Sequence, residues 1–306
     1  MNRLQVAIVG TPYPQLTAAL AAAEVDIVED HLSAEAAIVT FGGTSAELTE
    51  LATNSSTLRW VQLPSAGIEA FNDALKARPD LQWTSAKGAY GEPVAEHALA
   101  LTLALLRELP KRVVARSWAP ASGTSLHGLR ITVVGSGGVA LEIVRLMKCF
   151  RTDVTVVRRT EADAAGADRT ISTAQLHEAL PKTDVLVLAA ALTPATRNMI
   201  SATELALLGE HAIIVNIARG GLIDTTALTE HLAANKIAGA ALDVTEPEPL
   251  PDGHPLWTEP RALITPHAAD TLEMIQPLFA ARVAENLSRF GSGLALTGQV
   301  DAAAGY

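Results

Sequence analysis

The sequence is poor in features on which several classes of protein depend. It has one cysteine, Cys149, among 306 residues, so neither an intrachain disulfide nor a zinc site built from cysteines can form. Basic residues form no run, and 33 Asp and Glu outnumber 23 Lys and Arg, which leaves a net charge of −10. Binding to nucleic acid needs a positive surface that neutralises phosphates. We therefore expect no nucleic-acid partner.

Long apolar segments are also missing. The longest uninterrupted apolar run is Val185 to Leu192, less than half of the ~20 residues that cross a membrane. Near the start, the apolar stretch from Val6 to Val9 leads into Gly10 and is too short for the core of a signal peptide. Histidine and cysteine show no spacing typical of metal ligands. We expect a cytoplasmic protein with no membrane partner and no metal.

The rest of the composition is that of a packed globular chain. Hydrophobic residues make up 49% and charged residues 18%, with a mean hydropathy of +0.24, and the length favours two domains. Short apolar runs alternate with helix-patterned segments, which predicts an α/β fold with mostly parallel sheets. The strands expected in the first hundred residues are Gln5 to Val9, Val25 to Val28, Ala37 to Thr40, Arg59 to Gln62 and Leu81 to Thr84.

A second strand series begins after a helix and a surface connection. The predicted helix, Glu92 to Arg107, is apolar on nearly every face and is therefore expected to be buried. Six strands of similar length suit a doubly wound nucleotide-binding sheet: Arg130 to Val134, Asp153 to Val157, Asp184 to Ala189, Ala212 to Ile217, Ala238 to Val244 and Ala262 to Thr265. A final amphipathic helix, with its apolar stripe between Ile275 and Phe290, is predicted to pack on the first domain.

A glycine-rich turn follows the first strand of this second series. Gly135, Gly137 and Ala140 have the GxGxxG/A spacing between a strand and a helix. Such a turn lets the backbone approach a pyrophosphate, which the N–H groups and dipole of the helix N-terminus then bind. We predict a dinucleotide site that includes Gly138 and Val139 at the start of the helix. The alternative is a glycine turn without a ligand.

Two arginines, Arg158 and Arg159, end the next predicted strand, 23 positions after the first glycine of the turn. A carboxylate at this place would bind the ribose hydroxyls of NAD, whereas an arginine can bind a 2′-phosphate. The sequence therefore predicts NADP (NADPH) as the preferred cofactor, with NAD possible. Two solvated arginines at a strand end are the alternative.

Three polar residues follow late strands, where open α/β sheets bind their ligands. They are Arg219, Glu248 and His267. His267 comes directly after a strand and behind Pro266, which rigidifies its approach. On position alone, His267 could equally be a histidine satisfied by local hydrogen bonds, and Glu248 a residue of a surface turn.

The chain resembles the D-isomer-specific 2-hydroxyacid dehydrogenase family, in particular glyoxylate/hydroxypyruvate reductases. The motifs recur in the family's order: VAEHALAL at Val94, the glycine turn, LTPATRNMI at Leu192, VNIARGGLID at Val215, ALDVTEPEPLP at Ala241, HPLW at His254 and TPHAA at Thr265. The resemblance implies a doubly wound Rossmann domain over residues 96–271 and a smaller, discontinuous flavodoxin-like α/β substrate domain over 1–95 and 272–306. It also implies catalysis between the domains and a homodimer formed partly through the helix near Val94.

The resemblance also assigns roles to residues. Arg219, Glu248 and His267 would be catalytic, with Arg219 also binding substrate. Thr193 and Ile217 would contact the cofactor and Asp243 would hold the nicotinamide carboxamide. The backbone around Ser65, Ala66 and Gly67 would bind the substrate carboxylate. The chain departs from the family at Gly138, where members commonly carry arginine, and at Asp270, where a small residue is more usual.

The residue types fit the implied chemistry. Reducing a 2-oxo acid leaves a developing alkoxide, which His267 would protonate as general acid while Glu248 stabilises its imidazolium. Arg219 would pair with the substrate carboxylate and polarise the carbonyl. We predict hydride transfer between NAD(P)H and a small 2-oxo acid such as glyoxylate or hydroxypyruvate, giving a D-2-hydroxy acid. The alternatives are a phosphoglycerate dehydrogenase-like enzyme, a formate dehydrogenase, which would carry glutamine in place of Glu248, and a non-catalytic, corepressor-like dinucleotide sensor.

Overall fold

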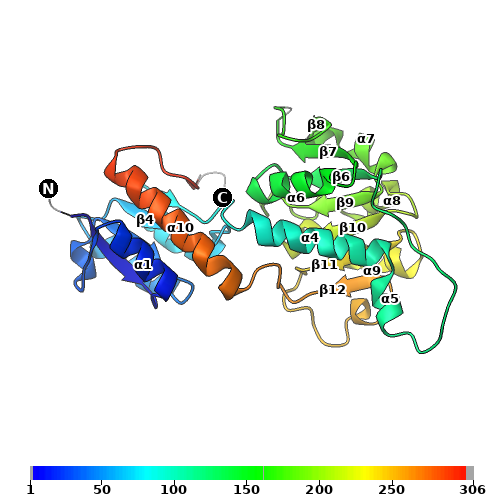
Figure 1. Ribbon diagram of the computed structural model, residues 1–306, viewed down its shortest axis with the longest axis horizontal. Coiled ribbons are helices and arrows are strands. Elements are labelled where there is room, and N and C mark those ends of the chain that lie inside the picture. The colour runs from blue at the N-terminus through cyan, green and yellow to red at the C-terminus, as the bar shows by residue number, and fades with distance from the viewer. Residues whose placement is uncertain (1–2, 161, 301–306) are drawn as a thin grey trace. The chain divides into compact units, whose positions relative to one another are not determined.

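The computed structural model describes residues 3–160 and 162–300, and its internal contacts divide the chain into two compact units (Figure 1). The first unit joins Met1–Tyr90 to Thr271–Tyr306, and the second is Gly91–Asp270. The predicted boundary after residue 95 would cut through helix α4, which runs continuously over Gly91–Leu106. The outer ends of the predicted substrate domain, residues 1–2 and 301–306, lie outside the described residues.

The first unit contains a parallel five-stranded sheet in the order β2-β1-β3-β4-β5, the flavodoxin-like order. All five predicted strands are present, and their ends differ from the prediction by at most one residue. The alternation of short apolar runs with helix-patterned segments was therefore sufficient to locate the strands of this unit. The strands are β1 (Gln5–Val9), β2 (Asp26–Ile27), β3 (Ala36–Val39), β4 (Trp60–Gln62) and β5 (Gln82–Thr84).

Helices pack in pairs in this unit. Helices α2 (Ser45–Asn54) and α3 (Asn72–Ala77) contact each other, and their apolar residues join those of the sheet in one core. Helix α1 (Pro14–Ala22) packs against α10 (Leu272–Gly291), the predicted C-terminal helix. The chain thus returns to its N-terminal strands, as predicted, with the ring of Phe290 5.4 Å from that of Trp60.

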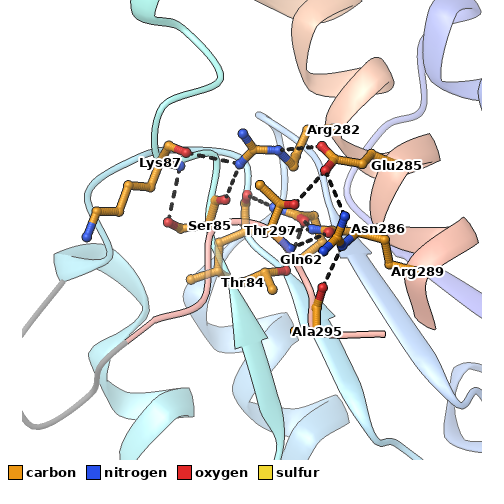
Figure 2. Close-up of polar contacts among 11 residues, drawn as sticks. Gln62, Thr84, Ser85, Lys87, Arg282, Glu285, Asn286, Arg289, Ala295 and Thr297 are labelled. Carbon is orange, nitrogen blue, oxygen red and sulfur yellow. Dashed lines mark hydrogen bonds and ion pairs between the residues drawn. The ribbon is translucent and has the colours of Figure 1, made fainter. Parts of the chain in front are cut away.

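A polar network ties the C-terminal segment to strands β4 and β5 (Figure 2). The amide of Asn286, fully buried in α10, donates to Gln62 Oε1 (2.8 Å) and to the carbonyl of Thr297 (2.9 Å). The N–H of Thr297 donates back to Asn286 Oδ1 at 2.8 Å. The hydroxyl of Thr84 donates to Gln62 Oε1, also at 2.8 Å. These bonds satisfy polar groups that would be costly to bury unpaired.

The second unit contains a parallel seven-stranded sheet in the order β12-β11-β10-β9-β6-β7-β8. The prediction of six strands was wrong by one. The missed strand, β8 (Arg169–Ser172), is polar and only partly buried, so it lacks the apolar run by which the others were recognised. The remaining strands are β6 (Arg130–Val134), β7 (Asp153–Arg158), β9 (Val185–Leu188), β10 (Ile213–Asn216), β11 (Gly239–Leu242) and β12 (Ala262–Ile264).

Helix α4 packs against α6 (Gly138–Lys148), and both also contact the sheet, so they cover the same face of it (Figure 1). Apolar residues of the remaining main helices join those of the strands in the core of this unit. These helices are α7 (Leu176–Ala179), α8 (Ala202–Leu207) and α9 (Thr225–Ala233), and the short α5 (Leu109–Val113) follows α4. Across the described part of the chain, no helix combines the length and apolar character needed to span a membrane.

Candidate active site

The glycine turn follows β6, where the strand order of the parallel sheet in the second unit reverses. Strand β6 pairs with β7 on one side and with β9 on the other, which is the switch point at which open α/β sheets bind ligands. Gly135 has a φ of +120°, and a Cβ there would collide with the carbonyl of Ala189 just beyond β9. Glycine is therefore required at this position, as the motif predicted.

The start of α6 fits the pyrophosphate of a dinucleotide. Gly137 is the N-cap and supplies no side-chain oxygen to the first N–H groups of the helix, which remain available to an anion. A Cβ on Gly137 would meet nothing within 4 Å, so the space above the turn is open. Ala140, the third position of the motif, is fully buried. Gly138 and Val139 lie between Gly137 and Ala140, at the start of the helix.

The other predicted cofactor residues lie at the same carboxyl edge. Arg158 ends β7, is half-buried, and donates to the carbonyl of Ala162 at 3.0 Å, while Arg159 is exposed. Thr193 follows β9, where its N–H donates to Thr196 Oγ1 at 2.8 Å. Ile217 follows β10 and donates its N–H to the carbonyl of Leu188 at 3.4 Å.

His267 and Glu248 are in direct contact although 19 residues separate them in the chain. The two atoms of the contact, His267 Nδ1 and Glu248 Oε1, are 2.7 Å apart. The side chains remain 47% and 44% exposed, so a small molecule can reach the imidazole. Because Glu248 occupies Nδ1, Nε2 is the ring nitrogen left for a substrate. The carboxylate of Glu248 thus orients the ring.

The backbone that carries His267 is held by Asp243. His267 has a φ of +52°, a left-handed conformation that non-glycine residues seldom adopt. Its N–H donates to the carbonyl of Asp243 at 2.8 Å. The Asp243 carboxylate accepts the N–H groups of Ala268 (2.8 Å) and Ala269 (3.1 Å) and the hydroxyl of Thr265 (2.6 Å). The loop is therefore fixed on both sides of the histidine.

The side chain of Asp243 is completely buried. Burial alone would raise the pKa of its carboxyl, but hydrogen bonds from His97, Thr265 and the two backbone N–H groups outweigh burial and lower that pKa. The carboxylate is engaged by the protein itself, and its predicted contact with a nicotinamide carboxamide stays a prediction. His97 and Thr265 belong to the motifs VAEHALAL and TPHAA, but no spacing within those motifs indicates that the two residues meet at Asp243.

Arg219 follows β10 and is positioned by Asn216, whose side-chain amide donates to the Arg219 carbonyl at 2.9 Å. Burial raises the pKa of the neighbouring Asp270 carboxyl, while the positive charges of His267 and Arg219 act on it in the opposite sense. Both charges therefore lie within electrostatic reach of one carboxyl group. Arg219, Glu248 and His267 follow β10, β11 and β12, which are neighbouring strands of the sheet, and of these three side chains Glu248 and His267 are in direct contact.

The predicted substrate loop lies in the first unit, after β4. Its backbone is stabilised by a bond from Ser65 Oγ to the carbonyl of Gly67 (2.6 Å) and by one from the N–H of Ala86 to the carbonyl of Ser65 (3.0 Å). Ala66, between them, is exposed. Among the described residues, no group of histidine, cysteine and carboxylate side chains could hold a metal ion.

Comparison with known proteins gives one family. The model of the NAD binding domain of D-isomer specific 2-hydroxyacid dehydrogenases matches residues 98–269. A glyoxylate reductase of Pyrococcus furiosus is 31% identical over 256 residues, which are 80% of this chain and 76% of that protein. A Corynebacterium melassecola protein described only as an uncharacterized protein in the proB 3′ region is 33% identical and covers 96% of this chain and 98% of its own.

A solved structure matches along the whole length. It is a D-isomer specific 2-hydroxyacid dehydrogenase of Xanthobacter autotrophicus, in complex with NADPH and MES, with a TM-score of 0.85, 27% identity and coverage of 100% of both chains. The family resemblance and the two-sheet α/β fold predicted from the sequence are confirmed. The chain belongs to the D-isomer specific 2-hydroxyacid dehydrogenase family and is an NAD(P)-dependent oxidoreductase.

Proposed function

We propose that the protein reduces small 2-oxo acids such as glyoxylate or hydroxypyruvate to D-2-hydroxy acids. The observation that carries the proposal is the contact between His267 Nδ1 and Glu248 Oε1 at 2.7 Å, on accessible side chains at the ligand-binding edge of the sheet. The similarity to a glyoxylate reductase over three quarters of that protein's length supports the substrate class.

The roles of the residues follow from their chemistry. Bound NADPH would supply the hydride, and the residues of this chain handle the proton and the charge. Nε2 of His267 gives its proton to the oxygen that becomes the hydroxyl, and Glu248 stabilises the imidazolium until then. Arg219 pairs with the substrate carboxylate and polarises the carbonyl. We assign Ser65, Ala66 and Gly67, in the proposed substrate domain, to the substrate carboxylate through their backbone.

NADPH is the proposed preferred cofactor. Arg158 ends β7, the strand beside β6, and Arg159 follows it, at the edge that also carries the glycine turn. A guanidinium can bind a 2′-phosphate through paired, charge-assisted hydrogen bonds. The Xanthobacter relative was solved with NADPH. Gly135, Gly137, Gly138 and Val139 are proposed to bind the pyrophosphate, and Thr193 and Ile217 to contact the rest of the cofactor.

A homodimer is also proposed. Apolar side chains of α5 and of the segment after it are exposed: Leu109 (45%), Val113 (73%), Val114 (65%) and Trp118 (102%). Contiguous exposed apolar residues of this kind mark an interaction surface. This exposed apolar surface directly follows helix α4 in the chain, and α4 is the helix through which the family resemblance implies dimerisation. The cytoplasmic location and the absence of a nucleic-acid partner stay predictions.

The proposal is tested by measuring kcat/KM for a panel of 2-oxo acids with NADPH and with NADH. We expect turnover of glyoxylate or hydroxypyruvate, with a higher kcat/KM for NADPH. Preference for 3-phosphohydroxypyruvate would identify a phosphoglycerate dehydrogenase-like enzyme instead. Dinucleotide binding without turnover of any 2-oxo acid would favour the sensor, and a strong preference for NADH would reject the role of the arginines.

A further inference from the structure

The carboxylate that holds the His267 loop has a partner on helix α4, in a different part of the sequence. His97 Nε2 lies 3.3 Å from Asp243 Oδ1 and 3.0 Å from Thr265 Oγ1. The histidine is 168 residues from Thr265 in the chain, and its side chain is 21% exposed. The contact therefore joins α4 to the loops that follow β11 and β12.

The directions of the hydrogen bonds determine that Nε2 of the His97 ring carries a proton. The hydroxyl of Thr265 gives its proton to Asp243 Oδ1 at 2.6 Å, so toward His97 its oxygen can only accept. His97 Nε2 must therefore carry a proton, which it directs at both Thr265 Oγ1 and Asp243 Oδ1. His97 acts here as a donor whether or not its other nitrogen is protonated.

From this arrangement we infer that His97 is a positioning residue for His267. His97 holds the buried carboxylate of Asp243, and that carboxylate holds the N–H groups of Ala268 and Ala269. These bonds keep His267 in its left-handed conformation. That conformation costs free energy and persists only because the surrounding contacts hold it. Without the His97 donor, the buried carboxylate loses one of the groups that compensate its burial, and the loop loosens.

The prediction for catalysis is a loss in kcat with little change in cofactor binding. A proton donor displaced by about 1 Å can cost ~100-fold in rate, so His97→Leu should lower kcat by about 10- to 100-fold. The Kd for NADPH should change much less than kcat, because the glycine turn that is proposed to bind the pyrophosphate is untouched. His97→Gln, which keeps a donor at a similar reach, should restore most of kcat.

A matched control lies one and a half turns along the same helix. The buried hydroxyl of Thr102 donates to the carbonyl of Ala98 at 2.7 Å and takes no part in the Asp243 contacts. Thr102→Val should lower the Tm of the protein but leave kcat unchanged. A general weakening of α4 is thereby separated from a specific effect on the His267 loop.

The test has a second arm that needs no turnover. Hydrogen exchange of the peptide covering residues 265–270 should be faster in His97→Leu than in the unchanged protein, and unaltered in Thr102→Val. The kinetic arm rests on the proposed function, whereas the exchange arm does not. If the wild-type protein is inactive on every 2-oxo acid, the proposed function is refuted. The hydrogen-exchange measurement then tests the positioning role of His97 by itself.

The inference is overturned if His97→Leu leaves both kcat and exchange of 265–270 unchanged, or if Thr102→Val changes them equally. Failure of His97→Gln to restore either quantity would also overturn it. Should His97→Leu not fold, Thr265→Val removes the hydroxyl between ring and carboxylate, and the same two measurements decide.

Discussion

The two units of the molecule each hold a buried polar network at the carboxyl ends of parallel strands, and the two networks differ in charge. In the first unit, the fully buried side chains of Gln62, Thr84 and Asn286 are neutral and join the C-terminal segment to β4 and β5, while the charged Glu285 binds the edge of this network through the hydroxyl of Thr297 (Figure 2). In the second, the carboxylate of Asp243 joins His97 and Thr265 to the loop of an accessible histidine.

The difference shows what each network can do. Neutral amides and hydroxyls that hydrogen-bond to one another stabilise the fold without burying a charge. Their loss should therefore lower stability and leave catalytic activity unchanged. The hydrogen-bond donors around a buried carboxylate offset the cost of burying its charge, so removing one of them should weaken the loop that the carboxylate holds. We therefore expect changes in the first network to act on stability and changes around the second to act on activity.

The largest effect is expected from His267→Asn, because asparagine tolerates the left-handed backbone but cannot act as the general acid. The kcat for reduction should fall by ~100-fold or more, while the Kd for NADPH, measured by fluorescence titration, stays nearly unchanged. Normal reduction of 2-oxo acids by this variant would show that His267 is not the proton donor.

Asn286→Ala should break the neutral network. Three hydrogen bonds of a fully buried amide are lost and Gln62 loses a partner, so the free energy of unfolding should fall by about 2–3 kcal/mol. Chemical denaturation measures the loss, and kcat per folded molecule should not change. Ser288→Ala, at an exposed position of the same helix α10, is the control and should cost less than about 0.5 kcal/mol. A large drop in kcat for Asn286→Ala would contradict the expectation that the network of the first unit affects stability but not activity.

Arg158→Gln tests whether charge at the carboxyl edge of the second unit selects the cofactor. The KM for NADPH should rise about 10-fold, because a charge-assisted contact with the 2′-phosphate is lost, and the KM for NADH should stay constant. Arg169→Gln, at the other end of the neighbouring strand β8, should change neither value. Equal changes for both cofactors would indicate that Arg158 has a structural role.

The smallest effect concerns the dependence of stability on pH. The pKa of Asp243 is lowered in the folded protein from the ordinary aspartate value of 3.8, so its ionised form stabilises the fold above that pH. This stabilisation is lost as the pH falls through the folded pKa. The difference in unfolding free energy between the unchanged protein and Asp243→Asn should thus be largest near neutral pH and shrink below about pH 4. A difference that is independent of pH would show that the carboxylate does not hold the loop by its charge.

Much of the fold was predictable because local patterns determine it. Buried parallel strands are apolar throughout, so β1 and β6 were predicted to the residue, and the turn at Gly135 was recognised from its spacing. Strand β8 was missed because RTIS is stabilised by pairing with β7 rather than by an apolar run. The predicted boundary after residue 95 lies inside α4, because a helix start depends on backbone bonds that its apolar pattern does not specify.

The residue types of the site and their place after strands are encoded locally, since strand ends and glycine turns depend on near neighbours in the chain. Which of these residues touch one another depends on how distant segments fold together. The pairing of His267 with Glu248, the burial of Asp243 and its contact with His97 arise from crossover connections that bring distant segments to one sheet edge. Hydrogen bonds form between neighbours in space, and local sequence patterns do not specify those neighbours.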